Sequence, residues 1–364
     1  MRNTAARPGG ALGERRSLLV VAVLALAALV LAACGVGGGQ GAPSGAGAPF
    51  VPAGSGGSQD GPPPDALAMT ATPGKFPLPQ GTPGVGKPQV VLGSKDFAEQ
   101  DLLNELYTQA LRAKGYTIIP KPRIGSSEVI DQAFAADQIQ MYPEYLGEIA
   151  TGSTMAALRT PPLNASSTYR AVQQFEQSQR AGQLFQQTPY ENVDTIVVKP
   201  DFAQRYGLET VADLDKVGPG GQGVKIAAQA PFRTRFSGLS GMASQYGLTQ
   251  LDPGFIPVPA GEAVYRALDS GQANAADAFS TDPQLLGNQY VPLRDPRNIF
   301  GSQFVAPVVK QATAQQEGPE FEQTCNWVSG LLTVRAIQQM NQAVANGQNP
   351  AVVAGTFLQQ NGLR

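Results

Sequence analysis

Two stretches of similar pattern determine the fold: EVIDQAFAADQIQMYPEY at residues 128–145 and EAVYRALDSGQANAADAF at residues 262–279. Each begins with a helix pattern, passes through a short polar turn and ends in a strand that finishes on an aromatic residue. A repeated helix–strand unit predicts two similar α/β lobes. Ligands of open α/β sheets bind at the carboxyl ends of strands, and Tyr142, Tyr145 and Phe279 stand at such ends.

Strand and helix patterns alternate around both stretches. An apolar run near residue 90 leads into an amphipathic helix that ends at Gly115, and Asp96 and Glu99 have the spacing of a capping box at its start. Ahead of the second stretch we expect strands at 194–200, 224–230 and 255–259 and helices at 210–217 and 238–247. Such alternation predicts parallel sheets with helices on both faces. The tail from residue 319 to residue 364 has a helical period, and we expect it to pack on the first lobe.

The first 33 residues have the pattern of an export signal. Four arginines precede an apolar run that ends in Leu-Ala-Ala directly before Cys34, a sequence that resembles the lipobox in which the cysteine is lipidated. The alternative is an uncleaved anchor helix, for which the apolar run is short. Residues 34–87, rich in Gly, Pro, Ala and Ser, are predicted to form a disordered tether behind that cysteine.

The composition excludes several classes of function. The chain has 364 residues, 42% hydrophobic and 15% charged, with a formal net charge of −2 and no histidine. This charge gives no basic field for nucleic acid, and the commonest general base and transition-metal ligand is missing. Neither a nucleotide loop nor metal-ligand spacing occurs, so we expect no enzyme activity, no cofactor and no metal. The second cysteine, Cys325, lies on an apolar helix stripe and is predicted to be a buried thiol without a disulfide partner.

Five segments together resemble a known family: GSKDFAEQ at 93–100, MYPEYLGE at 141–148, ADAFSTDPQL at 276–285, FVAPVV at 304–309 and MNQAVANGQNPAVVAGTFLQQNGL at 340–363. They are similar to segments of the substrate-binding lipoproteins of compatible-solute ABC importers, the glycine betaine/choline/carnitine group. The resemblance covers essentially all of residues 89–364.

The resemblance implies a type II periplasmic-binding-protein fold, with two α/β lobes joined by two hinge strands and the ligand in the cleft between them. Residues 88–193 plus 304–364 would form lobe 1, and residues 194–303 lobe 2. It also implies a monomer outside the cytoplasm, anchored to the cell membrane through Cys34. This protein would deliver its solute to an ABC permease driven by a separate ATPase.

The resemblance further implies a ligand site. Tyr145 matches a tyrosine of an aromatic cage, which holds a trimethylammonium group by cation–π attraction because that group cannot donate a hydrogen bond. Phe279 stands where another cage tyrosine is usual. Lys95 and Arg235 match the cations that hold the ligand's carboxylate. Tyr142 is expected to be a packing residue.

The chain departs from the family pattern at three site positions. Asp194 replaces a cage tyrosine, Gln303 falls where another tyrosine is expected, and Glu148 stands in place of a threonine that helps to bind a carboxylate. Glu148 would repel a betaine carboxylate. Three alternatives therefore stay open: a quaternary-ammonium solute, a different small polar or cationic solute in the same fold, or a scaffold lipoprotein without a ligand.

Overall fold

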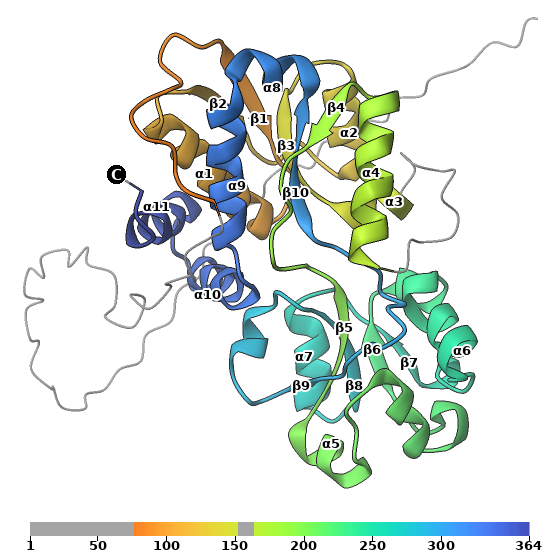
Figure 1. The fold of residues 1–364 in the computed structure, drawn as a ribbon. Helices are drawn as coiled ribbons and strands as arrows, with labels where there is room; N and C mark the ends of the chain where they lie inside the picture. Colours follow the sequence, from red (N-terminus) through yellow and green to blue (C-terminus); the bar gives the residue numbers. More distant parts are fainter. Residues whose placement is uncertain (1–75, 152–163, 364) are drawn as a thin grey trace, which may run out of the picture. The chain divides into compact units, whose positions relative to one another are not determined.

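The computed structural model describes residues 76–151 and 164–363, which belong to one compact unit. The first of its two sheets has five strands in the order β2-β1-β3-β10-β4 (Figure 1). Their bounds are β1 Gln89–Gly93, β2 Thr117–Lys121, β3 Met141–Tyr145, β4 Gly182–Leu184 and β10 Val305–Lys310. Strand β3 is central, and all five of its residues are buried.

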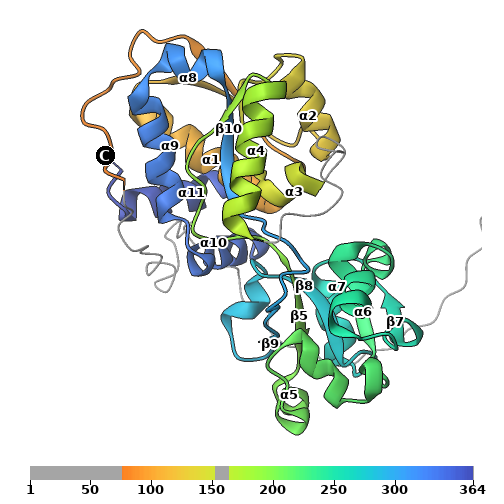
Figure 2. The same cartoon turned by 45° about the vertical axis from the view of Figure 1, so that its right-hand side comes forward.

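Helices cover both faces of this sheet (Figures 1 and 2). On one face lie α1 Ala98–Ala113, α9 Pro319–Leu331, α10 Val334–Ala345 and α11 Pro350–Gln360. On the other lie α2 Ser127–Ala135, α3 Leu146–Thr151 and α4 Ala165–Gln179, while α8 Gln311–Glu317 follows β10. The C-terminal helices share a core with α1, as expected, and Cys325 is a fully buried free thiol in it.

The second sheet repeats the topology of the first. Its order is β7-β6-β8-β5-β9, with bounds β5 Asp194–Val198, β6 Ile226–Ala228, β7 Phe255–Pro257, β8 Ala275–Phe279 and β9 Val291–Pro292. Its α-helices are α5 Pro200–Tyr206, α6 Gly241–Tyr246 and α7 Glu262–Asp269, and short 3-10 or π-helical segments accompany them. The pair α7–β8 therefore occupies the place that α2–β3 has in the first sheet, as the repeated pattern predicted.

The prediction of parallel sheets is wrong for one strand in each sheet, which runs antiparallel to both of its neighbours. Strands β1, β2 and β3 are parallel, but β10 runs antiparallel to β3 and β4. In the second sheet β5 is likewise antiparallel to β8 and β9. The physical reason is that β5 and β10 enter each sheet directly from the other sheet, without the crossover helix that would turn them parallel.

Two helix expectations near the second sheet also change. Residues Val211–Lys216 form a 3-10 helix, closed by a capping box between Thr210 and Asp213. The helix expected from residue 238 begins only at Gly241, after a π-helical turn at Phe236–Ser240. The capping box expected for α1 does not form, since its N-cap is Phe97 without a side-chain hydrogen bond.

Part of the predicted tether lies against the first sheet. Phe76 and Leu78 pack on its core, and the Gly84 amide donates to the Lys114 carbonyl. These few apolar residues explain why residues 76–87 depart from the prediction of disorder. The predicted signal, Cys34 and the rest of the tether lie outside the described residues. Within 76–151 and 164–363, no helix has the length and apolarity to span a bilayer, and no cluster of potential metal ligands occurs.

Candidate functional site

Tyr145 ends the central strand β3, and its surroundings fix it tightly. It pairs with Val305 of β10, and its side chain belongs to the core between the sheet and α1. The Tyr145 hydroxyl donates to Oε1 of Glu99 at 2.7 Å. Burial, together with the charge of Glu99, raises the pKa of Tyr145 well above its ordinary value, so the hydroxyl stays a donor.

The Glu99 carboxylate is the centre of a buried polar group. Besides Tyr145, Oε1 accepts from the Tyr190 hydroxyl at 3.2 Å and from Asn192 Nδ2 at 3.3 Å, and Oε2 accepts from Asn341 Nδ2 at 3.0 Å. Glu99 is 4% exposed. The sequence analysis missed this role, although Glu99 stands four residues before Leu103 on the apolar face of α1, which is the signal that could have shown it.

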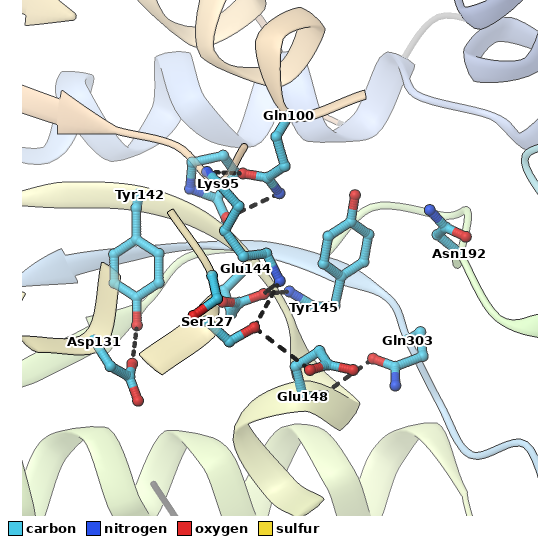
Figure 3. A network of polar contacts seen from close by, with 12 residues as sticks. Lys95, Gln100, Ser127, Asp131, Tyr142, Glu144, Tyr145, Glu148, Asn192 and Gln303 are labelled. Atoms are coloured by element: carbon cyan, nitrogen blue, oxygen red, sulfur yellow. Dashed lines mark hydrogen bonds and ion pairs between the residues drawn. The ribbon is translucent and has the colours of Figure 1, made fainter. Parts of the chain in front are cut away.

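Lys95 lies beside Tyr145 and is paired within the protein. Its Nζ is 2.6 Å from Oε1 of Glu144, and both side chains are almost fully buried (Figure 3). Burial raises the pKa of Glu144, and the Lys95 ammonium opposes that shift. Gln100 fixes the Lys95 backbone, because its Oε1 accepts from the Lys95 amide at 3.2 Å. The glutamate between the two tyrosines of β3 thus neutralises a buried lysine.

Two aromatic rings face this ammonium. Lys95 Nζ is 4.7 Å from the centroid of the Tyr145 ring and 5.9 Å from that of Phe97, and the two rings stack with centroids 6.0 Å apart. Phe97 is 38% exposed, unlike Tyr145. Phe97, which precedes α1, was not among the predicted site residues. These rings already make cation–π contacts with a cation of the protein.

Glu148 and Gln303 lie next to this group. The Ser127 hydroxyl connects Glu148 to Lys95, because Ser127 Oγ accepts from Lys95 Nζ at 3.2 Å and donates to Glu148 Oε2 at 3.4 Å (Figure 3). The Glu148 amide donates to Gln303 Oε1 at 3.2 Å. Gly147 makes this approach possible, since a Cβ there would stand 2.6 Å from the Gln303 carboxamide.

The other predicted site residues gather at the corresponding end of the second sheet. Asp194 and Phe279 face each other in the register of β5 and β8. Arg235 Nη2 is 2.7 Å from Oδ1 of Asp194 and 3.7 Å from Oδ2 of Asp277. Burial raises the pKa of Asp194 to about 6, against the effect of Arg235. Burial and then Asp194 raise the pKa of Asp277 well above its ordinary value.

The structure therefore brings the predicted residues together in two groups: Lys95, Tyr145, Glu148 and Gln303 with the first sheet, and Asp194, Arg235 and Phe279 with the second. The two chain segments that link the sheets run side by side, with a bridge between Glu191 and Phe304. The charge of Glu148 contributes to the raised pKa of Asp194, so the groups interact electrostatically. Tyr142 is outside both groups, buried edge-to-face on Phe134.

Residues 88–360 match the family model described as the substrate binding domain of the ABC-type glycine betaine transport system. The chain belongs to this family. It is 27% identical over 281 residues to the glycine betaine-binding protein YehZ of Escherichia coli strain K12. This match covers 75% of this chain and 90% of the relative. It is 28% identical over 289 residues to a glycine-betaine-binding protein of Pseudomonas aeruginosa, covering 75% and 88%.

A solved structure titled glycine betaine/carnitine/choline ABC transporter has the same fold. The TM-score is 0.67 at 23% identity, and the match covers 75% of this chain and 99% of that one. The expected family and the expected two-lobed α/β fold of binding proteins are confirmed. This family member is the solute-binding component of an ABC importer, and its family is a transport family and not an enzyme family.

Proposed function

We propose that this protein captures a quaternary-ammonium compatible solute, of the glycine betaine, choline or carnitine type, and delivers it to a membrane permease. The observation that carries the proposal is the family match over residues 88–360. Two relatives that match most of the same region are named as glycine betaine-binding proteins. Capture followed by delivery alters no covalent bond, so the proposal includes no enzyme activity.

The ring pair Phe97–Tyr145 and the ring of Phe279 are proposed to hold the ammonium group. Each ring would contribute roughly 0.5–2 kcal/mol through its face. This role is supported by the position of Lys95 Nζ, a cation of the protein itself, against the faces of the first two rings. Glu148, Asp194, Arg235 and Gln303 are proposed to surround the rest of the ligand, along with Lys95.

The proposed setting is the outer side of the cell membrane. Residues 1–33 would direct export, Cys34 would carry the lipid anchor, and the tether would let a monomeric body reach the permease. Residues 88–193 with 304–364 would move as one lobe and residues 194–303 as the other, closing on the solute between them.

A thermal-shift screen of the full chain, followed by isothermal titration, tests the function. Glycine betaine, choline, carnitine and a panel of polyols are the probes. A solute present at about a hundred times its dissociation constant adds about 2.7 kcal/mol to the free energy of unfolding. Stabilisation by a quaternary-ammonium compound supports the proposal, and a flat response to the whole panel contradicts it.

A different small polar or cationic solute is the second candidate. It is favoured by one observation: Asp194 and Gln303 supply polar groups where the family resemblance expects rings, so few rings face the ligand. Stabilisation by a polyol and none by the quaternary-ammonium compounds would select this candidate.

A further inference from the structure

Arg235 is bound by two carboxylates of the protein itself. Its Nη2 makes a 2.7 Å ion pair with Asp194, whose side chain is 11% exposed, and lies 3.7 Å from Asp277, whose side chain is 2% exposed. Its Nε donates to the Ser237 carbonyl at 3.2 Å. The guanidinium is thus held in place and compensated before any ligand arrives.

We propose that Asp194 is the specificity-determining residue of the site. By pairing with Arg235 it excludes ligands that carry a carboxylate, and it selects small organic cations of similar size that lack one. This inference rests on the proposed function and narrows its ligand from quaternary-ammonium solutes in general to those with a net positive charge.

The charges around Asp194 support cation selection. One guanidinium stands against two carboxylates, and Oδ1 of Asp277 is a buried oxygen without a hydrogen-bond partner among the described residues. If Asp194 and Asp277 together hold one proton, these two residues and Arg235 have no net charge. Glu148 then adds a negative charge, which acts electrostatically on Asp194. A ligand carboxylate at this position would therefore meet net repulsion from the surrounding carboxylates.

The other predicted carboxylate-binding residue is occupied as well. Lys95 Nζ is 2.6 Å from Glu144 Oε1 and also donates to Ser127. Within the described residues, both cations assigned to the ligand's carboxylate therefore already have a carboxylate partner. A cation without a carboxylate needs neither of them.

Isothermal titration at pH 7.5 with choline and glycine betaine tests this inference, because both carry a trimethylammonium group and only glycine betaine adds a carboxylate. We expect the native protein to bind choline at least about tenfold more tightly than glycine betaine. Asp194→Asn removes the nearer of the two carboxylates that pair with Arg235, so it should weaken choline binding by about tenfold and strengthen glycine betaine binding. Asp252→Asn is the matched control, since it removes an exposed carboxylate paired with Arg233 in the same lobe and should leave both affinities unchanged.

Equal or tighter binding of glycine betaine by the native protein would overturn the inference and leave the proposed function standing. A choline-to-betaine ratio that Asp194→Asn does not change, with circular dichroism confirming its fold, would also overturn it. If the variant does not fold, the native ratio decides alone. If neither compound binds, this inference fails, and the proposed function fails with it when carnitine does not bind either.

Discussion

Four side chains donate to the carboxylate of Glu99, and they come from three separate parts of the chain. Tyr145 and Asn341 belong to β3 and α10, and Tyr190 and Asn192 belong to the segment that leads into β5. Because buried donors that lose their acceptor stay desolvated and unpaired, the arrangement depends on this one acceptor. Glu99 thereby fixes the Tyr145 ring from its hydroxyl end.

Glu99→Ala is expected to lower the free energy of unfolding by on the order of 3 kcal/mol, since it leaves the two tyrosine hydroxyls without their acceptor. Urea unfolding followed by circular dichroism measures this change. Glu105→Ala on the same helix is the control, because the hydrogen bond that Glu105 accepts from Gln109 is half-buried and joins two residues of α1. Equal losses in the two variants would refute the central role of Glu99.

The raised pKa of Asp194 predicts a pH dependence with a definite sign. Its value of about 6 in the folded protein lies above the ordinary 3.8. Between these values the folded state holds more protons than the unfolded state, so this residue's contribution to stability is present below pH 4 and is lost as the pH rises through 6. Its loss amounts to on the order of 2–3 kcal/mol.

The contribution of Asp194 is isolated by comparing the native protein with Asp194→Asn. The difference in unfolding free energy between the two should fall as the pH rises from 4 to 6.5, and urea titrations at half-unit steps measure it. A difference that is constant across this range would mean that Asp194 titrates in its ordinary range.

Helix α10 connects the C-terminal helices to the turn after β8. Gln338 Nε2 donates to the Ser280 carbonyl at 2.8 Å, and Asn341 Nδ2 donates to the Thr281 carbonyl at 3.1 Å as well as to Glu99. Ser280 Oγ in turn donates to the Glu191 carbonyl and accepts from the Val193 amide. The turn that follows Phe279 is therefore held by both the helix and the linking segment.

Gln338→Ala should loosen this turn. Loss of one neutral hydrogen bond costs about 1 kcal/mol, so the amides of residues 280–286 should exchange with solvent about fivefold faster. Hydrogen–deuterium exchange with mass spectrometry measures the rate. Gln342→Ala, which removes only a surface contact with Asn346, is the control. Unchanged exchange in the Gln338 variant would show that the turn is held without α10.

Sequence patterns predicted the helices and strands better than the direction in which the strands pair. The units α2–β3 and α7–β8 follow from local periodicity and a polar turn, so their equivalence could be predicted. The antiparallel direction of β5 and β10 depends on where the chain re-enters a sheet, which no local pattern encodes. The site divides likewise. Tyr145 and Phe279 could be found because each ends a strand, whereas the pairing of Lys95 with Glu144 depends on two segments 49 residues apart.

Each sheet has its own cores, and the two sheets share a topology. The chain has a single tryptophan, Trp327, and it lies in α9 within the first sheet's core. Fluorescence therefore reports the unfolding of the first sheet and its helices, whereas far-UV circular dichroism reports both sheets. Proteins with several cores need not unfold in one step.

A solute that contacts both sheets should stabilise both. At about a hundred times its dissociation constant, the urea midpoints seen by Trp327 fluorescence and by circular dichroism should both rise, by an amount equivalent to about 2.7 kcal/mol. Titration of the full chain with and without the solute measures both midpoints. A raised fluorescence midpoint, together with a separate phase of the circular-dichroism transition that does not shift, would place the solute on the first sheet only.

Strand β10 lies between β3 and β4, yet its residues come late in the chain. Until residue 310 is available, β3 has an open edge and β4 has no neighbour in the sheet. A polypeptide that emerges N-terminus first, from a ribosome or a translocation channel, therefore cannot finish its earlier sheet until most of its later one has also emerged. Open strand edges are prone to aggregate. The edge of β3 therefore stays open from the emergence of Tyr145 until that of Lys310, while all five strands of the second sheet emerge.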